Sequence, residues 1–178
     1  MSRPSQQRAG FTLTEILVAL LIVATLAGIS FPLVRAGMRS AHRATCLSNL
    51  RQIGVGVELY TQDHGQRMPD LATGRDSKDE DKDVIENTLD EYLENPEVFH
   101  CPADEGEFEA TGSSYGWNPV VSGRRLGRLE FFGSDETESI PLVYDKENWH
   151  ESGEENGTNI LYANWTTTNE INFSIDDE

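Results

Sequence analysis

Nineteen consecutive residues near the N-terminus, from Ile16 to Val34, carry no formal charge. As an α-helix, a run of this length extends roughly 28 Å, which matches the hydrocarbon thickness of a bilayer. The sequence therefore predicts one membrane-spanning helix, with the folded part of the chain after it.

A carboxylate, Glu15, stands at the entrance of this apolar run. In a helix that begins at Phe11 it would lie roughly 6 Å along the axis. An ionisable group deeper in the bilayer costs a few kcal/mol, so such groups usually have a partner or a function. Cleavage after Gly10 would create a free α-amine on Phe11 as a nearby cation. The alternative is that Glu15 reaches back to the lipid headgroups.

The run from Gly10 to Glu15, GFTLTE, follows a basic leader that contains Arg3 and Arg8. With the apolar run behind it, it resembles the prepilin-type cleavage and methylation signal of type IV pilins and type II secretion pseudopilins. The resemblance implies that a prepilin peptidase cuts between Gly10 and Phe11, that the new Phe11 amine is methylated, and that Glu15 guides subunit docking. A secretory signal peptide is a weaker interpretation, because its apolar region would be only about 7–15 residues long.

The chain is strongly acidic, with a formal charge of −17. Removal of the ten-residue leader, which carries two arginines and no acid, would leave −19. A surface of this sign disfavours nucleic acid and anionic lipid, and suits cations or basic partners. Nucleic acid is therefore not an expected partner.

Four arginines (Arg35, Arg39, Arg43 and Arg51) follow the apolar run, and only two precede it. The positive-inside rule alone would place the C-terminus in the cytoplasm. The resemblance to pilins implies the reverse: a cytoplasmic leader, a single pass through the inner membrane, and a head in the periplasm or in an exported filament. We expect this second orientation, because the leader must reach its peptidase.

The helix is predicted to continue beyond the membrane and to end near Asp63, since Gly65 and Pro69 follow. Pro32 predicts a kink, because proline removes a backbone donor. Apolar residues recur at steps of four, three, four and three along one face: Cys46, Leu50, Ile53, Val57 and Tyr60. The opposite face is predicted to carry Arg43, Ser48, Arg51, Gln52 and Glu58.

An acidic run at residues 76–83 (DSKDEDKD) is predicted to be a solvated loop. Its alternating aspartates imitate the opening of a calcium-binding loop. The sixth loop position would be Val84 and the twelfth Asp90, so an EF-hand is excluded. A nonstandard calcium site remains an alternative. Residues 84–93 then predict a short helix.

The remainder of the chain is β-like, with short segments rich in β-branched and aromatic residues. The predicted strands are residues 113–121, 128–132, 140–144, 159–165 and 170–175, the last two forming a hairpin through 166–169. The expected fold is α+β and pilin-like, with a long N-terminal helix packed on a small antiparallel sheet. The expected domains are a leader (1–10), a transmembrane helix (11–35), its amphipathic continuation (36–66) and an acidic head (67–178).

Two further stretches narrow the resemblance. Residues 46–54 (CLSNLRQIG) and 98–104 (VFHCPAD) look like motifs of pseudopilin-like proteins abundant in planctomycetes and verrucomicrobia. In those proteins a histidine precedes a strand of the type asparagine, two apolar residues, aromatic, alanine, aspartate, glycine. Here His150 precedes residues 159–163 (NILYA), but an Asn-Trp pair replaces Asp-Gly. A role tied to that aspartate is therefore not carried over.

The two cysteines, Cys46 and Cys101, are predicted to form a disulfide, because both follow the span into a compartment that permits oxidation. Two buried free thiols are the alternative. The four histidines (His42, His64, His100 and His150) show no metal-ligand spacing with one another or with the cysteines, so each is expected on the surface or in a loop. No metal site is predicted.

The expected function is that of a structural subunit, major or minor, of a type II secretion pseudopilus or a type IV pilus-like filament. The partners that the resemblance implies are prepilin peptidase, other pilin or pseudopilin subunits, an inner-membrane assembly platform and membrane lipid. No phosphate-binding loop and no nucleophile elbow occur, so an enzyme is not expected, and no cofactor is predicted apart from the calcium alternative. Two alternatives stay open: a membrane-tethered binding module, and an enzyme anchored by a pilin-like helix.

Overall fold

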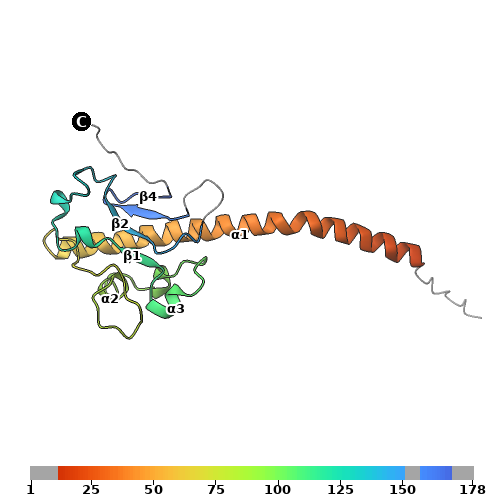
Figure 1. Cartoon of the computed structure of the whole chain (residues 1–178), viewed down its shortest axis with the longest axis horizontal. Coiled ribbons are helices and arrows are strands. Elements are labelled where there is room, and N and C mark those ends of the chain that lie inside the picture. Colours follow the sequence, from red (N-terminus) through yellow and green to blue (C-terminus); the bar gives the residue numbers. More distant parts are fainter. Residues whose placement is uncertain (1–11, 151–156, 170–178) are drawn as a thin grey trace, which may run out of the picture. The chain divides into compact units, whose positions relative to one another are not determined.

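The computed structural model describes residues 12–150 and 157–169. The chain divides into two compact units, Met1–Met38 and Arg39–Glu178. One helix, α1 (Leu13–Asp63), contributes to both units (Figure 1). The predicted cleavage site at Gly10 and Phe11 lies outside the described residues.

Helix α1 ends at Asp63, where the sequence predicted its end. The chain then turns through Gly65, whose φ of 65° lies in the left-handed region that glycine adopts without strain. The helix is unbroken at Pro32. The kink that was expected there stays a prediction.

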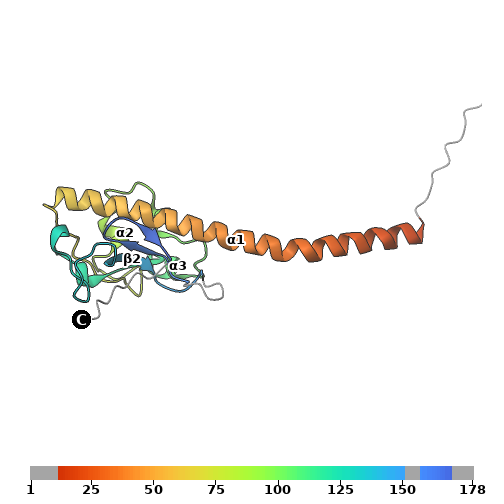
Figure 2. The same ribbon diagram turned by 90° about the horizontal axis from the view of Figure 1, so that it is seen from above.

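The second unit contains a four-stranded antiparallel sheet in the order β1-β2-β3-β4. Its strands are β1 (Tyr115–Trp117), β2 (Pro141–Asp145), β3 (Ile160–Tyr162) and β4 (Thr167–Thr168). Figures 1 and 2 both show the second half of α1 running beside this sheet. The predicted α+β, pilin-like fold class, a long N-terminal helix with a small antiparallel sheet, is confirmed.

The strand predictions hold for three elements and fail for a fourth. Residues 128–132 form no strand: a 3-10 turn, η3 (Leu126–Arg128), precedes a bridge between Phe131 and Ser134. Between the bridge partners the chain reverses through Phe132, whose φ of 50° is incompatible with a strand. β-Propensity describes a side chain that suits a half-buried pleated surface, but a strand also needs a partner, and β2 is already paired on both sides.

Several helices and strands have other boundaries than the sequence predicted. The first predicted strand stops at Trp117, because Asn118 caps a 3-10 turn, η2 (Pro119–Val121), by accepting the Val120 N–H at 3.0 Å. Strand β4 occupies residues predicted to be the hairpin turn, and the predicted strand 170–175 lies outside the described residues. The helix predicted for 84–93 is shorter, α2 (Ile85–Thr88), and continues as a turn. The remaining elements are η1 (Pro96–Phe99) and α3 (Glu107–Thr111).

The core of the head lies between the second half of α1 and the sheet. Four members of the predicted stripe are fully buried: Cys46, Leu50, Ile53 and Val57. Gly54 permits the close approach, because a Cβ there would lie 3.2 Å from the side chain of Leu161 on β3. One assignment was wrong: Arg43, expected on the solvent face, is half-buried, and its guanidinium donates to the backbone carbonyl of His150.

Candidate functional site

The first functional feature is the start of α1. Thr12 is the residue before the helix, and Glu15 is its third residue. The Glu15 carboxylate accepts the Thr12 backbone N–H at 2.8 Å and the Thr12 hydroxyl at 2.9 Å, while the Glu15 N–H donates to that hydroxyl at 3.3 Å. This reciprocal arrangement is a capping box, which satisfies backbone donors that a helix start leaves without partners.

The capping box gives Glu15 a partner within its own chain. The sequence interpretation considered only a methylated amine or the headgroups as partners for this carboxylate. The signal was present in the sequence, since Thr-Leu-Thr-Glu fits the Ser/Thr-x-x-Glu pattern of a capping box. In the isolated chain Glu15 therefore starts the helix, and any docking role requires it to exchange this partner for another.

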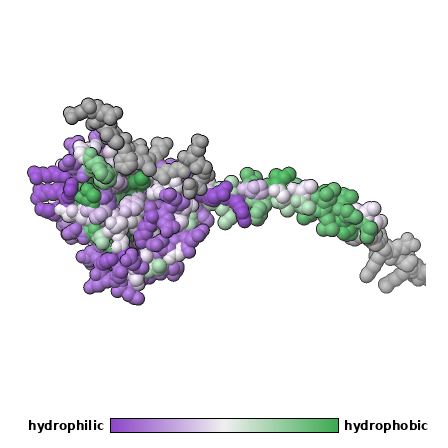
Figure 3. Space-filling model, in the orientation of Figure 1, coloured by the Kyte–Doolittle hydropathy of each residue, from purple (hydrophilic) through white to green (hydrophobic). Residues whose placement is uncertain are grey.

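The second feature is the apolar surface of the first helical half. Every residue from 12 to 41 is exposed, and the large apolar side chains between Leu13 and Val34 are 49 to 82% exposed. In Figure 3 this part of the helix shows mostly apolar residues on the visible face. It is also the one helix in the described part of the chain that is long and apolar enough to cross a membrane.

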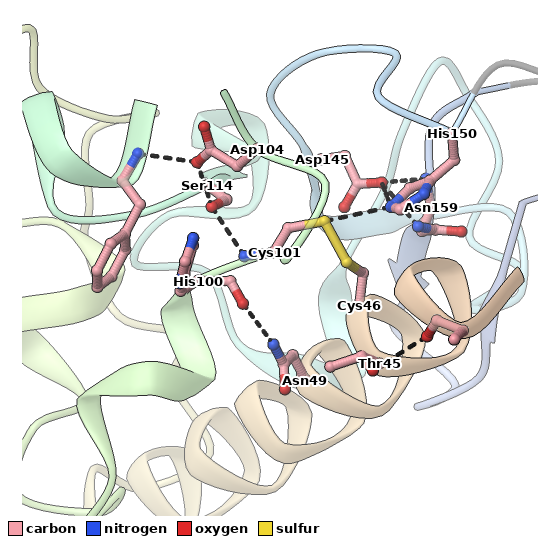
Figure 4. Close-up of a disulfide and its surroundings, with 12 residues drawn as sticks. Thr45, Cys46, Asn49, His100, Cys101, Asp104, Ser114, Asp145, His150 and Asn159 are labelled. Atoms are coloured by element: carbon pink, nitrogen blue, oxygen red, sulfur yellow. Dashed lines mark hydrogen bonds and ion pairs between the residues drawn. A yellow bond between two sulfur atoms is a disulfide. The ribbon is translucent and has the colours of Figure 1, made fainter. Parts of the chain in front are cut away.

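The third feature is the disulfide between Cys46 on α1 and Cys101 in the head (Figure 4). The Cα atoms are 5.1 Å apart, so the predicted pairing is confirmed. Two hydrogen bonds hold the same junction. Asn49 donates its amide to the carbonyl of His100 at 2.8 Å, and the Cys101 N–H donates to the Ser114 hydroxyl at 2.9 Å. The disulfide thus fixes the helix to the head at a point that is already well packed.

His150 lies beside the disulfide: it is in a loop, as expected, but it is not on the surface. Its side chain is buried, with 7% of the residue exposed. Its Nε2 atom is 3.2 Å from Cys101 Sγ and 3.8 Å from Asp145 Oδ2 (Figure 4). No local sequence pattern predicts this contact, because 49 positions separate His150 from Cys101. The two residues meet only through the folding of the sheet.

Asp145 closes the cluster from the end of β2. Its Oδ2 atom accepts the backbone N–H and the side-chain amide of Asn159, at 2.9 and 2.8 Å. Burial raises the pKa of Asp145 to about 7 in spite of these bonds. Burial, aided by the positive charge of Arg43, lowers the pKa of His150 to about 4. Near neutral pH the imidazole is therefore uncharged.

Two oxygens of this cluster lack a donor among the described residues: Asp145 Oδ1 and Asn159 Oδ1, both fully enclosed. Buried polar atoms of this kind are uncommon, and each calls for a cause. Within the described residues, Cys46, Cys101 and His150 form the one group whose potential metal-ligand atoms converge, within 4.8 Å of one another. Sequence analysis predicted the pairing of the two cysteines but not the approach of His150 to them.

The other candidate residues are spread over the head. The His64 ring stacks on Tyr60 near the end of α1, and the His100 ring stacks on Phe108 in the head. The aspartates of the acidic loop, Asp79, Asp81 and Asp83, are exposed. A calcium site there stays a prediction.

Comparison with known protein families finds one match, the prokaryotic N-terminal methylation motif, at residues 5–31. No curated protein and no solved structure matches the chain. The matched residues include the run GFTLTE and most of the apolar helix. The chain therefore carries a type IV pilin-like prepilin signal, and the head has to be interpreted from its own geometry.

Proposed function

We propose that this pilin-like chain is a structural subunit of a type II secretion pseudopilus or a type IV pilus-like filament. Prepilin peptidase would cleave between Gly10 and Phe11 and leave 168 residues with a methylated Phe11 amine. The observation that carries the proposal is the methylation motif at the start of a helix whose large apolar side chains between Leu13 and Val34 are exposed within the described part of the chain.

The exposed half of α1 suits two successive surroundings, lipid before assembly and neighbouring helices after it. Before assembly, its uncharged length suits a single pass through the inner membrane, with the acidic head on the periplasmic side. After extraction from lipid, the same side chains need other apolar surfaces, because exposed apolar area of this extent is unfavourable in water. Identical helices of neighbouring subunits provide such surfaces, and an inner-membrane assembly platform would bring them together.

Glu15 supports the proposal through its position and its present partner. In the single chain its carboxylate is held by Thr12. In a filament it would pair with the methylated amine of Phe11 on a neighbour, both removed from water among apolar helices. Loss of one member of such a pair typically costs about 3–5 kcal/mol, because the other charge is left without compensation. This role requires no catalytic residue and no cofactor, so we infer that the protein is not an enzyme.

The test compares two substitutions in the same capping box. Glu15→Ala removes the carboxylate, and Thr12→Ala removes the hydroxyl but leaves the carboxylate free to pair with a neighbour. Both variants are expected to be cleaved and inserted in the membrane, which intact-mass analysis of membrane extracts would show. Only Glu15→Ala is expected to be absent from sheared filaments.

Three results would contradict the proposal. Normal incorporation of Glu15→Ala into filaments would remove the docking role. Equal loss of both variants would assign Glu15 to helix capping alone. An unprocessed Met1 terminus in the wild-type protein would overturn the processing step itself.

A further inference from the structure

We propose that the pocket around the disulfide is a metal site when the two cysteines are reduced, taking a divalent cation with an affinity for thiolate and imidazole, such as Zn²⁺. The ligands would be Cys46, Cys101, His150 and Asp145. The inference rests on the head alone and is independent of the filament role.

Three of the proposed donors already converge, and the fourth lies beside His150 (Figure 4). The two sulfurs and His150 Nε2 lie within 4.8 Å of one another, and Asp145 Oδ2 lies 3.8 Å from Nε2. In a tetrahedral zinc site with Zn–S bonds of about 2.3 Å, neighbouring ligand atoms are roughly 3.3–3.8 Å apart. The two bonded sulfurs have to move apart, which rotation of the cysteine side chains after reduction supplies, and the Asp145 carboxylate has to turn toward the group formed by the other three donors.

The donors come from separate elements, which makes the arrangement a built site. Cys46 lies on α1, Cys101 follows η1, Asp145 ends β2, and His150 lies in the loop after it. All four residues are buried. A cation held here would replace the disulfide as the link between α1 and the head.

The unpaired oxygen of Asp145 is the independent sign of a missing partner. This residue is 2% exposed, and its Oδ1 atom has no donor among the described residues. A buried carboxylate without full hydrogen bonding is costly unless it neutralises or binds a cation. Asn159 holds the carboxylate through Oδ2 with two hydrogen bonds, as the partners of metal ligands commonly do.

Charge also balances in the reduced state. Two thiolates carry two negative charges, and a divalent cation carries two positive ones. Arg43 adds positive charge near the site, since its guanidinium donates to the His150 carbonyl. The neutral imidazole of His150 is the form that binds metal.

The disulfide and the metal exclude each other, because the cation binds cysteine thiolates and a disulfide has none. Reduction by a phosphine transfers two electrons to the S–S bond. Water supplies the oxygen that ends on phosphorus and the two protons that end on sulfur. Metal binding then displaces those thiol protons to the buffer. The head would be linked by the disulfide in oxidising conditions and by the cation in reducing ones.

The test uses cobalt(II) as the probe, added to the full chain without a polyhistidine tag in non-ionic detergent. After reduction with a water-soluble phosphine, one cobalt per chain is expected to bind. It should show the visible bands of tetrahedral cobalt together with thiolate-to-cobalt charge transfer. Excess Zn²⁺ should bleach these bands, and the oxidised chain, which is the matched control, should show neither.

Variants assign the ligands. Cys46→Ser is expected to abolish the charge-transfer band, and His150→Gln, which keeps a similar volume, should weaken cobalt binding more than about 100-fold. Asp145→Asn should weaken it about 10- to 100-fold, in the range found when supporting groups of metal sites are changed. Near-UV circular dichroism of each variant in the oxidised state shows whether its head is folded, except for Cys46→Ser, which is compared with the reduced wild type.

Several results would overturn the proposal. Failure of the reduced wild-type chain to bind cobalt at micromolar concentration, or binding with no tetrahedral spectrum, would exclude the site. Equal binding by the oxidised chain, or unchanged affinity in His150→Gln, would place the metal elsewhere. Unfolding of the head on reduction that cobalt does not reverse would also refute the site.

Discussion

The two halves of α1 belong to one continuous helix and have opposite surroundings. In residues 13–38 the apolar side chains point outward on all sides and none is buried. In residues 39–63 one apolar stripe is fully buried against the head (Cys46, Leu50, Ile53 and Val57), and the exposed large apolar side chains are Val55 and Leu59. The first half of this continuous helix therefore needs an apolar partner outside the chain, whereas the second half packs on the head of the same chain.

The difference follows from the sequence pattern of each half. A helix that is apolar on all sides is unfavourable in water and has to bury its side chains in lipid or against other helices. An amphipathic helix covers its stripe with its own domain. Stability of the head should therefore depend only on the second half, whereas assembly should depend on the first.

The largest expected effect on head stability comes from the disulfide. Replacing both cysteines by serine should lower the free energy of unfolding by about 4 kcal/mol, since the bond closes a loop of 55 positions. Urea titration of the detergent-solubilised chain, followed by tryptophan fluorescence, measures it. A loss below about 1 kcal/mol would mean that packing alone holds the second half of α1 on the head.

The next effect separates the halves directly with one substitution made in each. Leu50→Ala should cost about 3 kcal/mol, because Leu50 is 0% exposed and its removal leaves a cavity. Leu21→Ala should leave the urea midpoint of the head unchanged, because Leu21 is 63% exposed. If Leu21→Ala destabilised the head as much, the two halves would not be independent.

The smallest effect is a pH dependence of the head in which two contributions oppose each other. Between about pH 4 and 7 the folded head keeps a proton on Asp145 that the unfolded chain loses, so this residue makes stability fall as pH rises. Between about pH 4 and 6.5 His150 binds its proton only in the unfolded chain, so it makes stability rise with pH. From these two residues, the wild-type urea midpoint should change little over this range.

Single variants reveal the two contributions. In Asp145→Asn the histidine is unopposed, so stability should rise from pH 4 to 6.5 more steeply than in the wild type. In His150→Gln the aspartate is unopposed, so stability should fall over the same range. The same slope in all three proteins would show that neither residue changes its pKa on folding. Leu21→Ala serves as the control, with the wild-type profile.

The end of the long helix and its buried stripe could be predicted from the sequence, because both follow from local sequence patterns. The end at Asp63 follows from Gly65, and the buried stripe follows from the helical period. Arg43 shows how charge misled that interpretation. It lies three positions before Cys46, so the period places it on the stripe side, although its charge suggested solvent.

Only part of the site around the disulfide could be predicted from the sequence. The chain has two cysteines, which leaves one possible pairing within it, so Cys46–Cys101 could be predicted. Asp145, His150 and Asn159 reach the same pocket only through the register of β2 and β3, which short β-like segments do not determine. The failed strand at residues 128–132 has the same origin, because pairing partners are set by the whole fold.

The central claim is that the first half of α1 is a surface for other copies of this chain. A photoreactive amino acid placed at Leu21 tests it most directly, with cross-linking in cells that assemble the filament and a second chain labelled at Asp79, in the exposed acidic loop, as the comparison. The account predicts covalent dimers and larger species from position 21, processed at Phe11, which disappear when Glu15→Ala is added. Only lipid adducts and monomers from position 21 in assembling cells would contradict it.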